Sequence, residues 1–241
     1  MIKELRRRAI LDRVRVSQSN YALRFDGVDD YVEIPNSESY FSFIENTHIF
    51  TIKLRFKIND LSGRNLILAT NLSSVYKGYA ITFDTFQDRT STIRLFLTNG
   101  IVGDFTSVSL FDNAINDNEL HELEIKGKGL NDFEFILDGF VYENSDLIYQ
   151  NTISQLPFPS NSDYNLDIGF FSPFNLFPLN GQIDYIKIWN QYKTDDSDVG
   201  IVANYQFNTG SGCQLLDSSG NNYHGDLMPD CPANSPEWIQ L

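Results

Sequence analysis

The clearest pattern in the chain is a strict alternation of apolar and polar residues over residues 50–58, FTIKLRFKI. Because side chains two positions apart on a strand point the same way, this segment predicts a half-buried antiparallel strand with a wet outer face. The residues expected on its buried face are Phe50, Ile52, Leu54, Phe56 and Ile58.

Shorter runs of the same kind recur along the chain and are separated by turn dipeptides. Further strands are expected at 65–70, 78–84, 92–98, 120–126, 132–137, 140–143, 164–169, 182–190 and 201–207. Asp138-Gly139, between FEFIL and FVY, is a strong hairpin signal. Many short strands without a long helical pattern predict an all-β sandwich.

Two segments near the ends of this pattern carry distinctive motifs. Residues 21–35, YALRFDGVDDYVEIP, contain two short strand-like runs around an Asp-Gly-x-Asp-Asp turn. Residues 181–190, GQIDYIKIWN, form a strand in which Asp184 is expected to share a face with Ile186 and Ile188. A carboxylate on an apolar face needs hydrogen bonds, a charged partner or a metal ion.

Both segments resemble the concanavalin A-like, laminin-G-like jelly-roll family, in which they lie side by side near the centre of one sheet. Four more segments are similar to motifs of this family in the same order: TIKLRFKI, ELHELEIKGKGLNDFEFILDGFVYE, LDIGFF and ANYQFNTGSGCQLLDSSGNNYHGDL. The resemblance covers residues 21 to about 227. It implies a two-sheet antiparallel jelly-roll sandwich, with residues 21–241 as one domain after an N-terminal segment, 1–20.

The resemblance also implies a sugar- or receptor-binding scaffold and, less often, an enzyme. Laminarinase-type relatives carry Glu-x-Asp-x-x-Glu on one strand, because glycoside hydrolysis needs two carboxylates across a cleft. That spacing is absent here; Glu119, Glu122 and Glu124 come nearest, in the pattern of a solvated strand face. We therefore expect a protein without catalytic residues.

In many relatives a structural calcium ion joins the Asp of the final long strand to oxygens of the first strand and turn. Carried over by position, the resemblance implies a calcium site at Asp184, Asp26 and Gly27. The alternative is that Asp184 accepts hydrogen bonds and needs no ion. Asp29 and Asp30 are interpreted as turn residues.

Aromatic residues are concentrated in 160–178, among Asn and Pro. Ring faces stack on sugars, and Asn supplies hydrogen bonds, so the candidate ligand-binding residues are Tyr164, Phe171, Phe174 and Asn175. The alternatives are packing in the core and an interface with a neighbouring protein.

Charge divides the chain into two parts. Residues 1–15 carry six basic and two acidic groups, a local charge of +4, which leaves 12 basic and 30 acidic groups, −18, on the rest. We expect residues 1–20 to form a short helix or arm that docks onto subunits of a larger assembly, either copies of this chain in a homo-oligomer or other proteins. The docking residues are Ile2, Leu5, Arg6, Arg7, Arg8 and Leu11. The acidic remainder disfavours nucleic acid as a partner.

Location follows from what the sequence lacks. No run of about 18 apolar residues predicts membrane insertion, and the N-terminus lacks the apolar stretch of a secretory signal. Cys213 and Cys231 form either a bridge across the C-terminal loops or two reduced thiols. Together these features favour a non-enzymatic glycan- or receptor-binding module, extracellular or virion-associated, for example a phage fibre, decoration or tail protein. The alternatives are a purely structural assembly subunit and, less readily, a glycoside hydrolase.

Overall fold

The computed structural model describes residues 21–71, 76–86, 89–111, 115, 118–154 and 164–241. The N-terminal segment 1–20 lies outside the described residues, so its helix or arm, and docking through Ile2, Leu5, Arg6, Arg7, Arg8 and Leu11, stay predictions.

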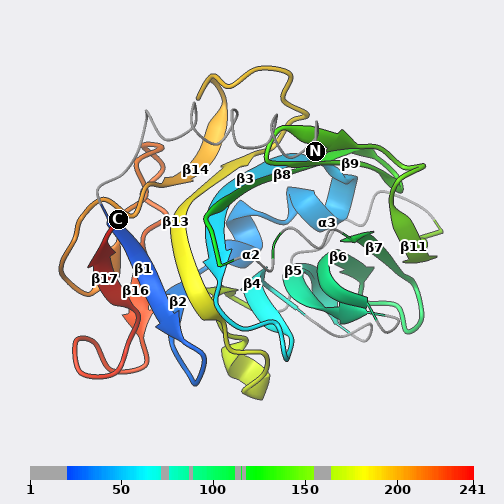
Figure 1. Cartoon of the computed structure of the whole chain (residues 1–241). Coiled ribbons are helices and arrows are strands. Elements are labelled where there is room, and N and C mark those ends of the chain that lie inside the picture. The colour runs from blue at the N-terminus through cyan, green and yellow to red at the C-terminus, as the bar shows by residue number, and fades with distance from the viewer. Residues whose placement is uncertain (1–20, 72–75, 87–88, 112–114, 116–117, 155–163) are drawn as a thin grey trace.

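Two antiparallel sheets packed face to face make up the fold (Figure 1). Sheet A has eight strands in the order β10-β9-β8-β3-β13-β1-β17, with β14 also paired to β13. The bounds of its strands are β1 Tyr21–Asp26, β3 Ile49–Ile58, β8 His121–Gly129, β9 Asp132–Leu137, β10 Phe140–Tyr142, β13 Asn180–Trp189, β14 Ile201–Tyr205 and β17 Glu237–Gln240.

Sheet B has nine strands in the order β11-β7-β6-β5-β4-β12-β2-β16-β15. The bounds of its strands are β2 Tyr31–Ile34, β4 Asn65–Ala69, β5 Lys77–Phe86, β6 Arg89–Asn99, β7 Phe105–Phe111, β11 Ile148–Asn151, β12 Leu166–Ile168, β15 Gln214–Leu215 and β16 Gly225–Met228. The two-sheet sandwich expected from the sequence is therefore confirmed.

The alternation at 50–58 is also confirmed. All five predicted inward residues, Phe50, Ile52, Leu54, Phe56 and Ile58, are at most 3% exposed. The hairpin at Asp138-Gly139 joins β9 to β10, and both turn residues have positive φ, as a two-residue hairpin turn requires.

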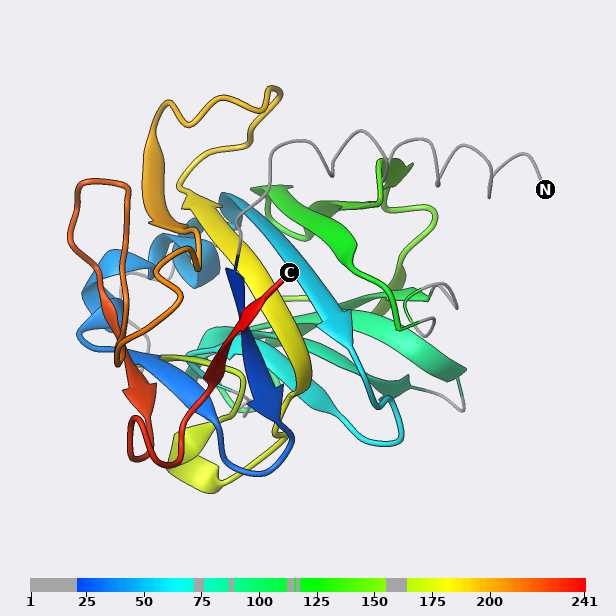
Figure 2. The ribbon, with the colours of Figure 1, turned by 60° about the vertical axis from the view of Figure 1, so that its left-hand side comes forward.

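The two end segments are placed only partly as the resemblance implied. β1 pairs with β13 in sheet A, as the resemblance implied. β2, however, pairs with β12 and β16 in sheet B, because the turn after Asp26 carries the chain from one sheet to the other (Figure 2). The implied placement of residues 21–35 and 181–190 side by side in one sheet therefore holds for β1 and β13 but not for β2.

Two short helices lie between the sheets, α2 Ser37–Tyr40 and α3 Phe43–Thr47 (Figure 1). Phe41, between the helices, and Ile44, in α3, are fully buried in the shared core. A disulfide joins Cys213 to Cys231. None of the described helices is long and apolar enough to cross a membrane.

Candidate functional site

The outer face of sheet A carries a buried ion pair between Arg55 and Asp184. The Arg55 guanidinium lies 3.1 Å from the Asp184 carboxylate, and both side chains are at most 7% exposed. The register of β13 against β3 shifts between Ile183 and Tyr185, so β13 has one residue more than β3 at this point. This bulge separates Asp184 from the alternation of Ile186 and Ile188, so the expectation that the three share one face was wrong.

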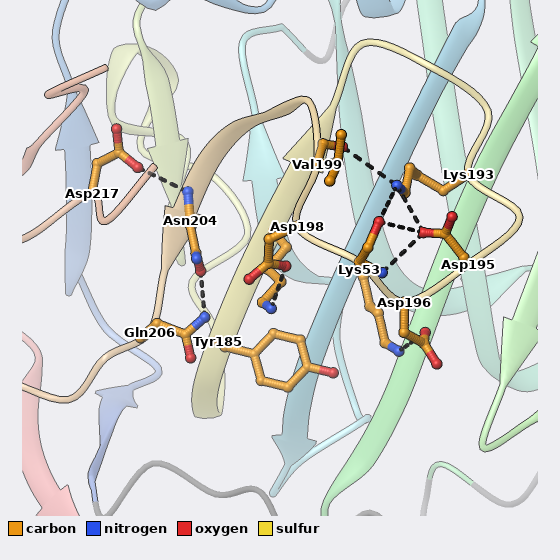
Figure 3. A network of polar contacts seen from close by, with 12 residues as sticks. Lys53, Tyr185, Lys193, Asp195, Asp196, Asp198, Val199, Asn204, Gln206 and Asp217 are labelled. Carbon is orange, nitrogen blue, oxygen red and sulfur yellow. Dashed lines mark hydrogen bonds and ion pairs between the residues drawn. The ribbon is translucent and has the colours of Figure 1, made fainter. Parts of the chain in front are cut away.

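Other charges on the same face are paired as well. Lys53 Nζ lies 3.1 Å from Glu122 and 3.2 Å from Asp196, and the Tyr185 hydroxyl donates to Glu122 over 2.5 Å. Burial and the Glu122 carboxylate raise the pKa of Tyr185, so its phenol stays neutral. The loop after β13 places Asp196 beside Lys53 and Asp195 beside Lys193 (Figure 3).

These pairs also bear on catalysis. Glu122 is engaged by Lys53 and Tyr185, and Glu124 lies 3.3 Å from Lys126. Glu119, the third acid of the nearest hydrolase-like spacing, is an exposed residue in the segment before β8. Glu122 and Glu124, the two acids of this spacing that lie on β8, are therefore both engaged by neighbouring side chains.

A different kind of surface lies on sheet B, where four aromatic rings meet. We call Tyr76, Tyr164, Phe171 and Phe174 the aromatic cluster. Tyr164 is edge-to-face with Tyr76, Phe171 and Phe174, with ring centroids 5.8–5.9 Å apart. Phe171 is fully buried, whereas Phe174 is 45% and Tyr76 40% exposed. The cluster thus has a buried base and exposed rings above it, and exposed aromatic rings can pack against the apolar face of another ring.

The loop after β12 builds this cluster through tight backbone turns. The single-turn helix η2 Ser172–Phe174 follows Phe171, and Phe171 and Leu176 exchange backbone hydrogen bonds of 3.0 and 3.3 Å. Asn175 closes the turn in the left-handed region, with φ 51°, which Asn tolerates better than most residues. Gly169, with φ 94°, precedes the loop, and a Cβ there would lie 2.4 Å from the Phe25 ring.

The loop is fixed to the sheet beside it. The backbone N–H of Leu66 donates to the carbonyl of Phe177, and that of Leu179 donates to Gly169. The Arg64 guanidinium lies 4.4 Å from the centroid of the Phe177 ring. These contacts place the loop over the outer face of β4, so Phe171 packs on Leu66 and its apolar neighbours.

Polar side chains lie on the same outer face of sheet B, on the strands β6, β7 and β11. Arg94 donates from Nε to the Ser107 hydroxyl over 2.7 Å and from its terminal nitrogen to Gln150 over 3.0 Å. Phe96, two residues along β6, packs against the apolar group that includes Phe171. The Ser109 hydroxyl, on the residue opposite Arg94, is buried and has no hydrogen-bond partner among the described residues. Phe96 therefore links the apolar group beneath the cluster to the polar side chains around Arg94 on one sheet face.

Only some of the predicted ligand-binding residues lie together on the surface. Tyr164 and Phe174 are in the cluster, and Asn175 is exposed beside them. Phe171 is fully buried, so it supports the cluster and offers no exposed ring. Tyr76, which comes from a distant part of the sequence, was missed. Nothing in its local sequence indicates the contact, because the pairing of β4 with both β5 and β12 produces it.

The implied calcium ligands are not brought together by the strand register. Asp26 lies opposite Asn180 on β13, four residues from Asp184, and Asp184 is paired with Arg55. The set of Asp184 with Asp26 and Gly27 is therefore corrected: Asp184 belongs to a different place on the sheet.

The turn itself, however, gathers three carboxylates. Oxygen atoms of Asp26, Asp29 and Asp30 all lie within 4.8 Å of one another. Burial raises the pKa of Asp30 to about 6, although the Asp26 N–H donates to its carboxylate over 2.9 Å. Carboxylate oxygens are the ligands that Ca²⁺ prefers, so the donor chemistry fits this ion. Asp29 and Asp30 form the turn as expected, and they also converge on Asp26.

No family model matches the chain, and no curated protein matches it. Among solved structures, a Bacteroides ovatus protein whose description proposes carbohydrate binding has a TM-score of 0.59 at 15% identity, covering 93% of this chain and 61% of that one. The CBM40 module of the Ruminococcus gnavus IT-sialidase has a TM-score of 0.53 at 10% identity, covering 73% and 92%.

Tailspike protein 2 of the Escherichia coli O157:H7 bacteriophage CAB120 has a TM-score of 0.51 at 12% identity. The match covers 80% of this chain and 31% of the tailspike, and the chain also spans less than two thirds of the Bacteroides protein. At such low identities these matches bear on the fold alone. They agree with the strand order: the chain has an antiparallel jelly-roll sandwich fold.

Proposed function

We propose that this protein is a non-enzymatic glycan-binding module that binds through the outer face of sheet B. The observation that carries the proposal is the aromatic cluster, with Tyr76 and Phe174 exposed, beside the polar side chains around Arg94. Sugar rings combine an apolar face with hydroxyl groups, and this surface offers partners for both. The fold neighbours described as carbohydrate-binding support the same conclusion.

Charge favours neutral glycans over acidic ones as ligands. The chain has a net charge of −14, which lowers the local concentration of anions near its surface. Several of its cations are already paired, among them Lys53, Arg55 and Lys193. In this respect we expect a difference from the CBM40 module, which has been solved with sialyllactose.

A glycan array tests the proposal. Wild-type protein is expected to bind a set of neutral glycans, and binding of sialylated glycans is expected to be weaker than that of the matched neutral ones. Released reducing sugar should stay at the level of the blank, since the Glu-x-Asp-x-x-Glu spacing of hydrolase relatives is absent from the sequence. Absence of glycan binding, or turnover of a bound glycan, contradicts the proposal.

A purely structural role in an assembly is the second candidate. Phe174 and Leu176 expose apolar surface, as do Ile101 and Val102 in the loop between β6 and β7, and such residues also suit a protein interface. The similarity to a phage tailspike is compatible with a virion protein, and the N-terminal arm is proposed to dock the module there. Deleting residues 1–16 should then abolish incorporation into the assembly while the sandwich stays folded.

The disulfide supports a location outside a reducing cytoplasm. Cys213 is exposed and bonded to Cys231, and such bonds persist mainly in oxidising environments. An extracellular or virion-associated location therefore remains our proposal. We also propose that the turn at Asp26, Asp29 and Asp30 holds a structural Ca²⁺ ion, whose binding would tie the crossing between the two sheets.

A further inference from the structure

Asp167 is a buried acid beneath the loop that carries the aromatic cluster. It is the middle residue of β12, and because Leu166 and Ile168 point into the core, Asp167 points to the outer face of sheet B. Its side chain is nevertheless only 1% exposed. The loop from Gly169 to Leu179 returns over this face, so docking of the loop removes Asp167 from water.

The contacts of Asp167 go to the start of that loop. Its Oδ2 accepts hydrogen bonds from the Ser172 backbone N–H over 2.9 Å and from the Ser172 hydroxyl over 2.7 Å. Ser172 is the first residue of η2, directly after Phe171 and two residues before Phe174. Asp167 thus holds the segment that carries two of the four rings.

No cation among the described residues pairs with Asp167. The residue opposite it on β2 is an acid, Glu33, and the residue opposite on β4 is Ala69. The other titratable group nearby is Tyr31, whose own pKa is raised by burial and then by Asp167, so that it stays neutral. An ionised carboxylate without a counter-charge is expensive to bury, whereas a neutral carboxyl group is not.

We infer that Asp167 is a positioning residue of the aromatic cluster, and that the loop is docked most firmly when this carboxyl group is protonated. The biological role of this docking rests on the proposed glycan-binding function, but the experiment that tests the docking needs no glycan. Burial raises the pKa of Asp167 to about 7, and this effect exceeds the opposite one of the two Ser172 hydrogen bonds. In the undocked loop the group would be hydrated and would return toward its ordinary value, near 4.

The direction of the pH dependence of loop docking follows from the number of protons that each state binds. Between about pH 4 and 7 the docked state binds more protons than the undocked state, so docking weakens as the pH rises. One proton is involved, so the docking equilibrium falls by up to about tenfold per pH unit in this window and is level above about pH 7. The cluster is therefore assembled most firmly under mildly acidic conditions.

Hydrogen exchange tests this without any glycan. The reporters are backbone amides whose hydrogen bonds need the docked loop, those of Ser172, Leu176 and Leu66. After correction for the intrinsic pH dependence of exchange, their protection in the wild type should fall by up to about 100-fold from pH 5 to 7. Asp167→Asn keeps an acceptor oxygen but cannot ionise, so the protection of these amides in the variant should not change between pH 5 and 7.

The control is Glu33→Gln, which removes the neighbouring charge and should keep most of the wild-type slope. If Asp167→Asn does not fold, Ser172→Ala serves as the test variant. Losing the hydroxyl donor raises the pKa of Asp167 further, so protection should go on falling above pH 7. The inference is overturned if amide protection in the wild type does not change with pH, or if it falls with the same slope in Asp167→Asn. It is also overturned if protection in Ser172→Ala stops falling at pH 7. Failure of glycan binding alone affects only the proposed function.

Discussion

The guanidinium of Arg55 and the carboxylate of Asp184 form a buried ion pair across β3 and β13, with 3.1 Å between Nη1 and Oδ2. The two residues are adjacent because the bulge in β13 inserts one residue opposite Arg55. A buried pair is costly to desolvate as a whole, but losing one partner leaves the other charge buried without its nearest opposite charge.

The first prediction concerns this pair. Asp184→Ala should lower the free energy of unfolding by about 3–5 kcal/mol, since Arg55 would stay buried without its partner carboxylate. Arg55→Met combined with Asp184→Leu should cost less than the single change, because neither charge remains. Urea denaturation of the three proteins measures both effects. A single variant as stable as the wild type would mean that the pair is not buried in solution.

The second prediction concerns the disulfide. Cys213 and Cys231 are 18 residues apart, and closing a loop of this size stabilises a protein by about 3 kcal/mol. Replacing both cysteines by serine should lower stability by that amount, and the reductant-treated wild type should behave like the variant. The bridge lies beside β15 and β16, so loss of structure should begin there in hydrogen exchange. Free thiols in protein purified without reductant would contradict the bridge.

The third prediction concerns Ca²⁺ and pH at the acidic turn. The pKa of Asp30 is raised to about 6, so without an ion this group lowers stability as the pH rises from about 4 to 6. Ca²⁺ should oppose that effect and raise the Tm at pH 7.5, and Asp30→Asn should abolish the shift. The control Asp226→Asn removes an exposed carboxylate of β16 that is not part of the group Asp26, Asp29 and Asp30, so Ca²⁺ should still raise the Tm of this variant. If Ca²⁺ raised the Tm of both variants equally, the ion would not bind at Asp30.

Much of the fold can be predicted from the sequence because its signals are local. The alternation of β3 needs only a period of two, and the hairpin at Asp138-Gly139 needs only two residues of positive φ. Strands such as β7 and β11 were missed, since Ser107 and Ser109 on the outer face of β7 weaken the apolar signal.

The candidate site is harder to predict because it depends on long-range pairing. Tyr164 and Phe174 were found from their aromatic neighbourhood, but Tyr76 joins them only through the order of strands in sheet B. Asp184 was misplaced because a bulge reverses the alternation, and no residue type marks that bulge. Asp167 carries no signal at all within the sequence, since its burial is created by the returning loop.

The central claim, glycan binding at the aromatic cluster, is tested most directly by calorimetric titration of three proteins with the strongest neutral glycan from the array. Phe174→Ala truncates an exposed ring of the cluster, whereas Val141→Ala truncates a residue of similar exposure on the edge strand β10 of sheet A. Truncating a central interface aromatic costs about 1–2 kcal/mol or more, so Phe174→Ala should weaken binding by about tenfold or more, with the Tm within a few degrees of wild type. Val141→Ala should bind like the wild type. Equal affinities for all three proteins would contradict the claim that the cluster is the binding site.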